Sequence, residues 1–139
     1  MEIKVFDFLT DEEKYIREAV FVKEQGFNEE YSHDDDIALH FLLYIDGNAV
    51  ATMRAVPEGN GVYHIGRVAV LKSYRKQGLG KELLLYAENY LKEIGAKKLF
   101  VSAQKRAIPF YEKIGFDKKG KEYLEEDYPH IYMEKELSD

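Results

Sequence analysis

The junction that most constrains the fold is an apolar run that ends in a basic, glycine-containing turn and opens a helix. The run is Val68-Ala69-Val70-Leu71, and the turn is Lys72-Ser73-Tyr74-Arg75-Lys76-Gln77-Gly78-Leu79-Gly80-Lys81. Apolar residues recur at helical spacing after Gly80, so the chain passes from strand to turn to helix. The backbone N–H groups of residues 76 to 81 are therefore expected to lie unpaired at a helix N-terminus, where the helix dipole favours a bound anion.

The charge of this turn is opposite in sign to that of the whole chain. Lys72, Arg75, Lys76 and Lys81 put four positive charges into a stretch without an acid, whereas the 139-residue protein has a formal net charge of −6. This local reversal favours a negatively charged ligand. The turn has no Gly-Lys-Ser/Thr, and Leu83 stands where a dinucleotide loop needs its third glycine. What remains is an Arg-x-x-Gly-x-Gly motif formed by Arg75, Gly78 and Gly80.

Length and composition bound the class of protein. With 45% hydrophobic residues, the chain is long enough for one domain over residues 1–139 and too short for two ordinary ones. No apolar run approaches the ~18 residues of a membrane span and no secretory signal opens the chain, so we expect a cytoplasmic protein without a membrane partner. The lack of cysteine and the scattered histidines predict no metal site. The acidic net charge argues against nucleic acid as a partner.

The residue patterns predict an α/β (α+β) fold with a mixed, mostly antiparallel sheet. Strands are expected over residues 2–8, 38–45, 49–56, 62–71, 97–103, 116–121 and 130–137. Helices are expected from Thr10 to about Gln25, with a capping box at Thr10 and Glu13, from Gly80 to Ile94, and over residues 107–114. Residues 26–36 carry five acids without lysine or arginine and read as a solvated loop. The long central helix predicts that strands 62–71 and 97–103 run parallel.

Further motifs follow the basic turn in a fixed order. They are Arg67-Val68-Ala69-Val70 before it, the long helix after it, and Phe110-Tyr111-Glu112-Lys113-Ile114-Gly115-Phe116. Over residues 37 to 137 the chain resembles the Gcn5-related N-acetyltransferases (GNAT). The stretch 21–26, the acidic loop, Ala103-Gln104 and His130-Ile131-Tyr132-Met133 resemble a bacterial subgroup of unassigned acceptor. The resemblance implies six to seven strands with one splayed parallel pair and about four helices.

The resemblance also implies a reaction and a set of site residues. It implies an N-acetyltransferase that moves the acetyl group of acetyl-CoA directly to a primary amine of a small molecule or a protein, within a ternary complex. Tyr111 would be the general acid, and the backbone N–H of Val70 would face the thioester oxygen. Gln104 stands where better-known members often have Asn. The CoA-binding residues would be Val68, Ala69, Val70, Arg75, Lys76, Gln77, Gly78, Leu79, Gly80, Lys81, Gln104, Phe110 and Tyr111.

The proton acceptor and the acceptor pocket are less constrained. The base stays open among Glu24, Glu29, Asp35, His40 and His130, each of which also has a structural interpretation; Glu24 is carried forward as a base or substrate contact. Gln25, Arg67 and His130 are candidates for the acceptor pocket. The acidic loop 26–36 would attract a cationic amine. Arg54 is expected to pair across neighbouring strands with a nearby Glu or Asp.

Two other functions stay open at this point. One is a non-catalytic acyl-CoA-binding or sensing module, in which Tyr111 only packs. The other is an interaction domain whose basic turn contacts an acidic partner. The residues do not define the acceptor, the acyl-chain preference or the oligomeric state, and exposed sheet edges leave a homodimer open.

Overall fold

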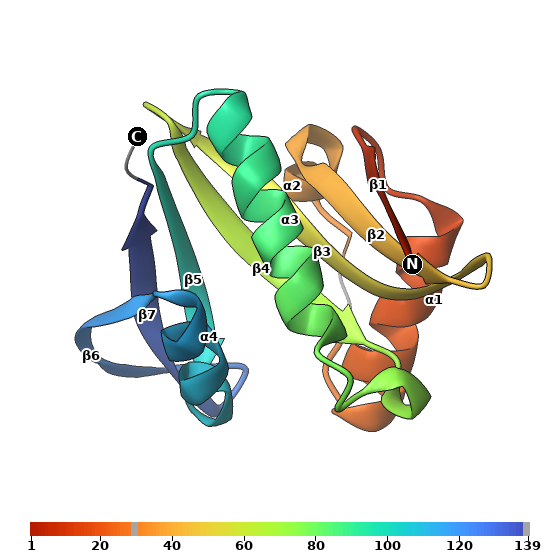
Figure 1. The fold of residues 1–139 in the computed structure, drawn as a ribbon. Helices are drawn as coiled ribbons and strands as arrows, with labels where there is room; N and C mark the ends of the chain where they lie inside the picture. Colours follow the sequence, from red (N-terminus) through yellow and green to blue (C-terminus); the bar gives the residue numbers. More distant parts are fainter. Residues whose placement is uncertain (29–30, 138–139) are drawn as a thin grey trace.

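The fold is a single mixed sheet with helices on both faces, seen in a computed structural model that describes residues 1–28 and 31–137 (Figure 1). The strand order is β1-β2-β3-β4-β5-β7-β6. Paired neighbours run antiparallel except β4 and β5, which are parallel. The predicted fold class is thereby confirmed. The strands are β1 Glu2–Phe6, β2 Leu39–Ile45, β3 Asn48–Gly59, β4 Val62–Val70, β5 Lys98–Gln104, β6 Asp117–Glu125 and β7 Tyr128–Glu136.

The helices divide between the two faces of the sheet. Figure 1 shows α3 crossing in front of the strands, whereas β3 passes in front of α1. None of the described helices is long and apolar enough to span a membrane. The helical segments are α1 Asp11–Arg17, the π-helix η1 Glu18–Glu24, α2 His33–Ile37, the 3₁₀ turn η2 Lys72–Tyr74, α3 Leu79–Glu93, the 3₁₀ turn η3 Lys105–Ala107 and α4 Ile108–Ile114.

The parallel pair β4–β5 separates halfway along its length, as the family resemblance implied. The ladder runs from Val62 opposite Lys98 to Ile65 opposite Val101 and ends there, although both strands continue. The register of β4 against β3 shifts by one residue between Thr52 and Arg54. Arg67, in the part of β4 opposite this shift, has a left-handed φ of 52°, as expected where an extra residue bulges a strand. Figure 1 shows the two strands diverging toward α4.

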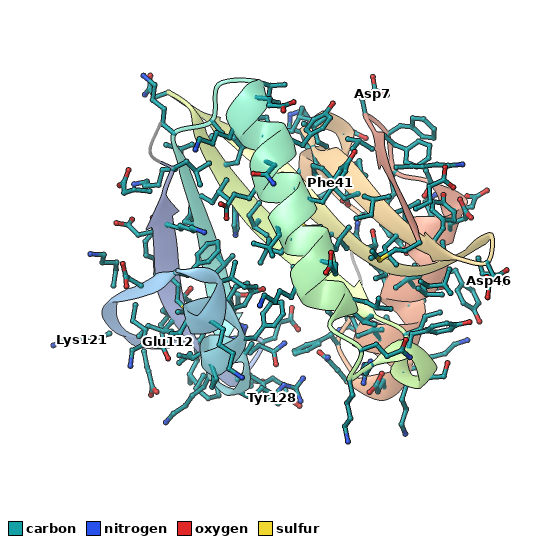
Figure 2. The ribbon with its side chains drawn as sticks, in the orientation of Figure 1. Asp7, Phe41, Asp46, Glu112, Lys121 and Tyr128 are labelled. Carbon is teal, nitrogen blue, oxygen red and sulfur yellow. The ribbon has the colours of Figure 1, made fainter. Side chains whose placement is uncertain are left out.

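The core packs mainly between α3 and the sheet. On α3 it buries Leu79, Leu83, Leu84, Ala87 and Leu91. Phe41 of β2 lies beneath the helix and meets Tyr90 edge-on, with ring centroids 5.6 Å apart (Figure 2). A smaller cluster on the other face joins Ile16 and Val20 to Leu42 and Ala69. Because the core holds both β4 and α3, it fixes the two ends of the basic turn between them.

The first predicted helix differs from expectation. The chain is α-helical only to Arg17 and then continues as η1, in which the N–H of Gln25 bonds the carbonyl of Val20 five residues back, at 3.1 Å. Thr10 Oγ1 accepts a hydrogen bond from the N–H of Glu13, as predicted. The Glu13 side chain instead hydrogen-bonds Arg17 and His40, so the predicted capping box is only half formed.

The predicted solvated loop over residues 26–36 is wrong for Asp35. This residue lies in α2 and is 2% exposed. Its Oδ1 accepts hydrogen bonds from Arg17 Nη1 and from Arg54 Nη1, each at 2.8 Å. Burial alone would raise the pKa of Asp35, but the hydrogen bonds from the two arginines outweigh it and lower the pKa to about 2. Arg54 therefore does pair with an acid, though one from α2 and not from a neighbouring strand.

Candidate active site

The basic turn forms an open N-terminus for α3. Gly78 is the N-cap residue, with a left-handed φ of 74° and open space where a Cβ would stand. No side chain caps the helix there, so the first N–H groups of α3 have no side-chain acceptor from the cap position. The helix starts at Leu79, which places its N-terminus within the predicted range of residues 76 to 81. The chain thus presents uncapped N–H groups and basic side chains at one point.

A cavity of about 420 Å³ lies against this turn, and we call it the turn cavity. Nine of the predicted CoA-binding residues line it, whereas Gln77, Gly78, Lys81 and Gln104 do not. A Cβ on Gly80 would come within 3.5 Å of Phe110 and 3.7 Å of Val70, so the first turn of α3 approaches α4 closely here. The lining residues are Val20, Gln25, Val68, Ala69, Val70, Tyr74, Arg75, Lys76, Leu79, Gly80, Ala107, Phe110 and Tyr111.

Arg75 connects the turn to two other elements. Its Nε donates to the Val70 carbonyl at 2.9 Å, and both terminal nitrogens bond the Glu24 carboxylate, with Nη2 2.6 Å from Oε1. The hydrogen bond from Arg75 lowers the pKa of Glu24, and the bond to Glu24 raises the pKa of Arg75. A carboxylate in such a pair is a weak proton acceptor. The geometry therefore weighs against Glu24 as the base.

A second cavity, of about 500 Å³, opens where β4 and β5 diverge, and we call it the cleft cavity. It shares Gln25, Val68, Ala107 and Tyr111 with the turn cavity. All three predicted acceptor-pocket residues line it: Gln25, Arg67 and His130. Gln104 lines it as well, and its Nε2 lies 3.5 Å from Gln25 Oε1. The remaining lining residues are Phe21, Phe27, Asn28, His64, Ser102, Ala103, Arg106, Glu125 and Glu126.

Tyr111 lines both cavities from α4. Two aromatic rings hold its ring edge-on: Phe110, with centroids 5.1 Å apart, and Phe116, with centroids 5.6 Å apart. Burial raises the pKa of Tyr111, because a phenolate loses its solvation in this environment. Tyr111 is therefore a fixed, neutral phenol at the boundary between the two cavities.

Several polar residues of the cleft cavity were not predicted. Ser102 Oγ hydrogen-bonds the hydroxyl of Tyr123 and donates to Glu125 Oε1 at 3.1 Å. His130, itself predicted, lies with Nε2 3.5 Å from Glu125 Oε2. The sequence pattern predicts no element between the strands 116–121 and 130–137, whereas β6 extends to Glu125. A continued strand pattern was the available signal, but no glycine or asparagine marks the turn that follows.

Two other candidate bases lie outside both cavities. Asp35 and His40 belong to a buried ionic cluster with Glu13, Arg17 and Arg54. In it, His40 Nδ1 is 2.8 Å from Glu13 Oε1 and Nε2 is 2.8 Å from the Asp35 carbonyl oxygen. Desolvation opposes the charge on His40, but the hydrogen bond to Glu13 outweighs it and raises the pKa. Glu29 lies outside the described residues. Of the four candidates within the described part of the chain, His130 is the one that lines the cleft cavity.

A splayed parallel pair, an uncapped helix N-terminus and a tyrosine between two cavities define the class of N-acetyltransferase that the sequence motifs resemble. Residues 9–137 match the family model described as an acetyltransferase (GNAT) domain. The chain belongs to the GNAT acetyltransferase family.

Individual relatives support this assignment over nearly the whole chain. YyaT of Bacillus subtilis is 35% identical over 128 residues, which cover 88% of this chain and 86% of YyaT. A crystal structure from Lactobacillus plantarum superposes with a TM-score of 0.90 at 28% identity, covering 99% of this chain and 98% of that one. The structure of an acyl-CoA N-acyltransferase from Pseudomonas aeruginosa gives a TM-score of 0.82 at 30% identity, with 96% and 97% covered.

Proposed function

We propose that this chain, acting as one domain, transfers the acetyl group of acetyl-CoA to a primary amine of a small molecule or a protein. Transfer is direct, within a ternary complex. The observation that carries the proposal is the position of Tyr111, which lines both the turn cavity and the cleft cavity. A donor in the first cavity and an acceptor in the second would meet beside its hydroxyl group.

The turn cavity suits the diphosphate and pantetheine of acetyl-CoA. The uncapped N–H groups of α3 and the side chains of Arg75 and Lys76 supply donors and positive charge for the diphosphate. The neighbouring Gln77, Gly78 and Lys81 would contribute through the same turn. Val68, Ala69 and Val70 lie beyond the last paired residues of β4 and β5, so this edge of β4 is open to the pantetheine amides. The similarity to an acyl-CoA N-acyltransferase supports a CoA thioester as the donor.

The backbone of Val70 suits the thioester oxygen. The N–H of Leu71 donates to the Val50 carbonyl at 2.9 Å, toward β3. Because successive residues of a strand direct their backbone groups to opposite edges, the N–H of Val70 faces the open side of β4. The bond from Arg75 Nε to the Val70 carbonyl restrains the next peptide unit, between Val70 and Leu71. A fixed N–H donor at the reacting carbonyl is what charge development on the oxygen requires.

Tyr111 would supply the proton that the departing thiolate needs. Its raised pKa keeps the phenol protonated at neutral pH, so the proton is present when negative charge forms on sulfur. Acetyl-CoA brings the activated thioester. The chain itself orients that thioester, excludes water through Phe110 and Tyr111, and donates the proton.

Thermal unfolding with acetyl-CoA, CoA, ATP and NAD at matched concentrations tests the donor. At about 100 times Kd, binding adds roughly 2.7 kcal/mol to the free energy of unfolding, so the midpoint should rise by several degrees with acetyl-CoA and CoA only. Equal shifts with all four nucleotides would favour the interaction-domain alternative. Release of CoA thiol in the presence of a primary amine then tests transfer.

Gly78→Glu should abolish the acetyl-CoA shift, because its carboxylate enters the open space at the helix N-terminus. Any side chain at Gly78 also strains a left-handed backbone, so Gly78→Gln is the matched control with the same size and the same strain. We expect Gly78→Gln to keep part of the shift. If the two variants lose it equally, charge at this position does not govern binding.

Glu24→Gln should tighten acetyl-CoA binding by a few-fold, because Glu24 holds Arg75 and adds negative charge beside the diphosphate site. The free energy of unfolding should change by less than about 1 kcal/mol, since both partners are about one third exposed. Calorimetric titration of CoA into both proteins measures the change. A weaker affinity in the variant would show that Glu24 positions Arg75 for binding and does not compete for it.

A further inference from the structure

We propose that the acceptor enters as a cationic primary amine, that its ammonium binds at Glu125, and that His130 Nε2 takes its proton. The inference rests on the proposed function and adds the charge class of the acceptor and the group that deprotonates it. It rests on the geometry of one side of the cleft cavity, formed by Glu125, Glu126 and His130 of the β6–β7 hairpin.

His130 has one ring nitrogen hydrogen-bonded to the backbone and the other facing Glu125. Its Nδ1 lies 2.8 Å from the Tyr128 carbonyl oxygen, and because a carbonyl only accepts, Nδ1 must carry the hydrogen. The neutral ring therefore has its lone pair on Nε2. This nitrogen is 3.5 Å from Glu125 Oε2, longer than an ordinary hydrogen bond, in a residue that is 4% exposed and lines the cleft cavity.

Glu125 is held in place by its other oxygen. Ser102 Oγ on β5 donates to Oε1 at 3.1 Å, and Tyr123 on β6 hydrogen-bonds the same hydroxyl. Tyr123 lies directly across the β6–β7 ladder from His130, and their rings stack with centroids 6.2 Å apart. Oε2 and Nε2 are thus two acceptors 3.5 Å apart, on residues that both line the cleft cavity.

The order of the strands separates the acids of the cleft cavity from Arg67. Glu125 and the adjacent Glu126 belong to β6 and its turn, whereas Arg67 belongs to β4 and Arg106 to η3. Because β5 and β7 lie between β4 and β6, these two acids and Arg67 are on different sides of the site. A positively charged amine is stabilised beside the carboxylates of Glu125 and Glu126. In this proposal the attraction of a cationic acceptor comes from Glu125 and Glu126; of the acids in the loop 26–36, for which it is predicted, Asp35 is buried against two arginines.

The proton balance is simple. The ammonium gives one proton to His130 Nε2, which returns it to solvent, and the neutral amine forms a bond from nitrogen to the acetyl carbon. The bond from that carbon to sulfur breaks, and Tyr111 protonates the leaving thiolate. The second proton lost by the nitrogen restores Tyr111, so one proton is released for each amide and thiol formed.

The test uses amine pairs of equal shape and different charge. Propylamine is protonated at neutral pH, whereas its isostere O-ethylhydroxylamine is neutral; hexylamine and O-pentylhydroxylamine form a larger pair. Each is titrated into the CoA-saturated protein while the imidazole signals of His130 are followed by NMR. Thiol release from acetyl-CoA is then measured with the same amines.

We expect the alkylamines to perturb His130 and to bind Glu125→Gln at least about tenfold more weakly, while the neutral isosteres bind both proteins equally. His130→Asn keeps a donor for the Tyr128 carbonyl and removes Nε2. It should lose about 100-fold in kcat/KM with alkylamines and far less with the neutral isosteres. Glu122→Gln is the control variant, because it removes an acid of β6 that pairs with Lys105 and lies outside the cleft cavity. It should bind both amine classes as the wild type does.

The inference is overturned if no alkylamine perturbs His130, if Glu125→Gln and wild type bind alkylamines equally, or if His130→Asn loses the same factor with both amine classes. Failure of the proposed function looks different. In that case acetyl-CoA gives neither a thermal shift nor thiol release with any amine, even when amines bind at His130.

Discussion

Tyr111→Phe should reduce kcat by about 100-fold or more while leaving the affinity for acetyl-CoA unchanged. The substitution removes the phenolic proton from a ring that Phe110 and Phe116 hold in place, and general acid catalysis typically contributes factors of 10² to 10⁴. Steady-state thiol release gives kcat, and the acetyl-CoA thermal shift reports on binding and folding in the same preparation.

Tyr90→Phe is the matched control, because Tyr90 packs on Phe41 and lines neither cavity. It should keep full activity. If Tyr111→Phe binds acetyl-CoA and turns over at the wild-type rate, Tyr111 is a packing residue. If neither the wild type nor either variant turns over but all bind acetyl-CoA, the chain is the acyl-CoA-binding module considered as the alternative.

Asp35→Asn should lower the free energy of unfolding by about 3 to 5 kcal/mol, because it removes the carboxylate that pairs with the buried Arg54 and one of the two that pair with the buried Arg17. In a chain of this length that corresponds to a fall of roughly 10 °C or more in Tm. Asp36→Asn, on the same short helix but exposed, should change the free energy of unfolding by no more than about 0.5 kcal/mol. Urea unfolding of the three proteins measures both differences.

The difference in free energy of unfolding between wild type and Asp35→Asn should depend on pH. The folded-state pKa of Asp35, about 2, is below its ordinary value of 3.8. A depressed carboxyl pKa contributes stability that is complete above the unfolded value and is lost as the pH falls through the folded value. The difference between wild type and Asp35→Asn should therefore shrink between about pH 4 and pH 2. A constant difference over that range would mean that Asp35 acts through packing and not through charge.

The elements with local signals were predicted well from the sequence. The strand, turn and helix around Gly78 and Gly80 lie where the pattern placed them, because glycine, apolar spacing and β-branched residues all act within a few residues of one another. The burial of Asp35 had no such signal. Its partners are 18 and 19 residues away, and a run of three acids ordinarily indicates a solvated segment.

The site divides in the same way. Arg75 and Tyr111 each belong to a short contiguous motif, so both could be proposed from the sequence, and both line the turn cavity. Glu125 could not, because its place depends on the turn Glu126–Asp127, whose residues have φ values of 53° and 64°. Hairpin turns of that shape usually carry asparagine or glycine, and an acidic pair gives no turn signal.

The π-helix η1 makes the site sensitive to the length of the chain. Its five-residue hydrogen bond from Gln25 to Val20 accommodates one residue more than an α-helical turn would. Deleting a single residue there would restore ordinary winding and rotate Gln25 by about 100° around the helix axis, away from Gln104. A surface helix can absorb such an insertion or deletion without consequence, but here it would change the direction in which the Gln25 side chain points. Relatives that differ by one residue in this segment should therefore differ in what their clefts accept.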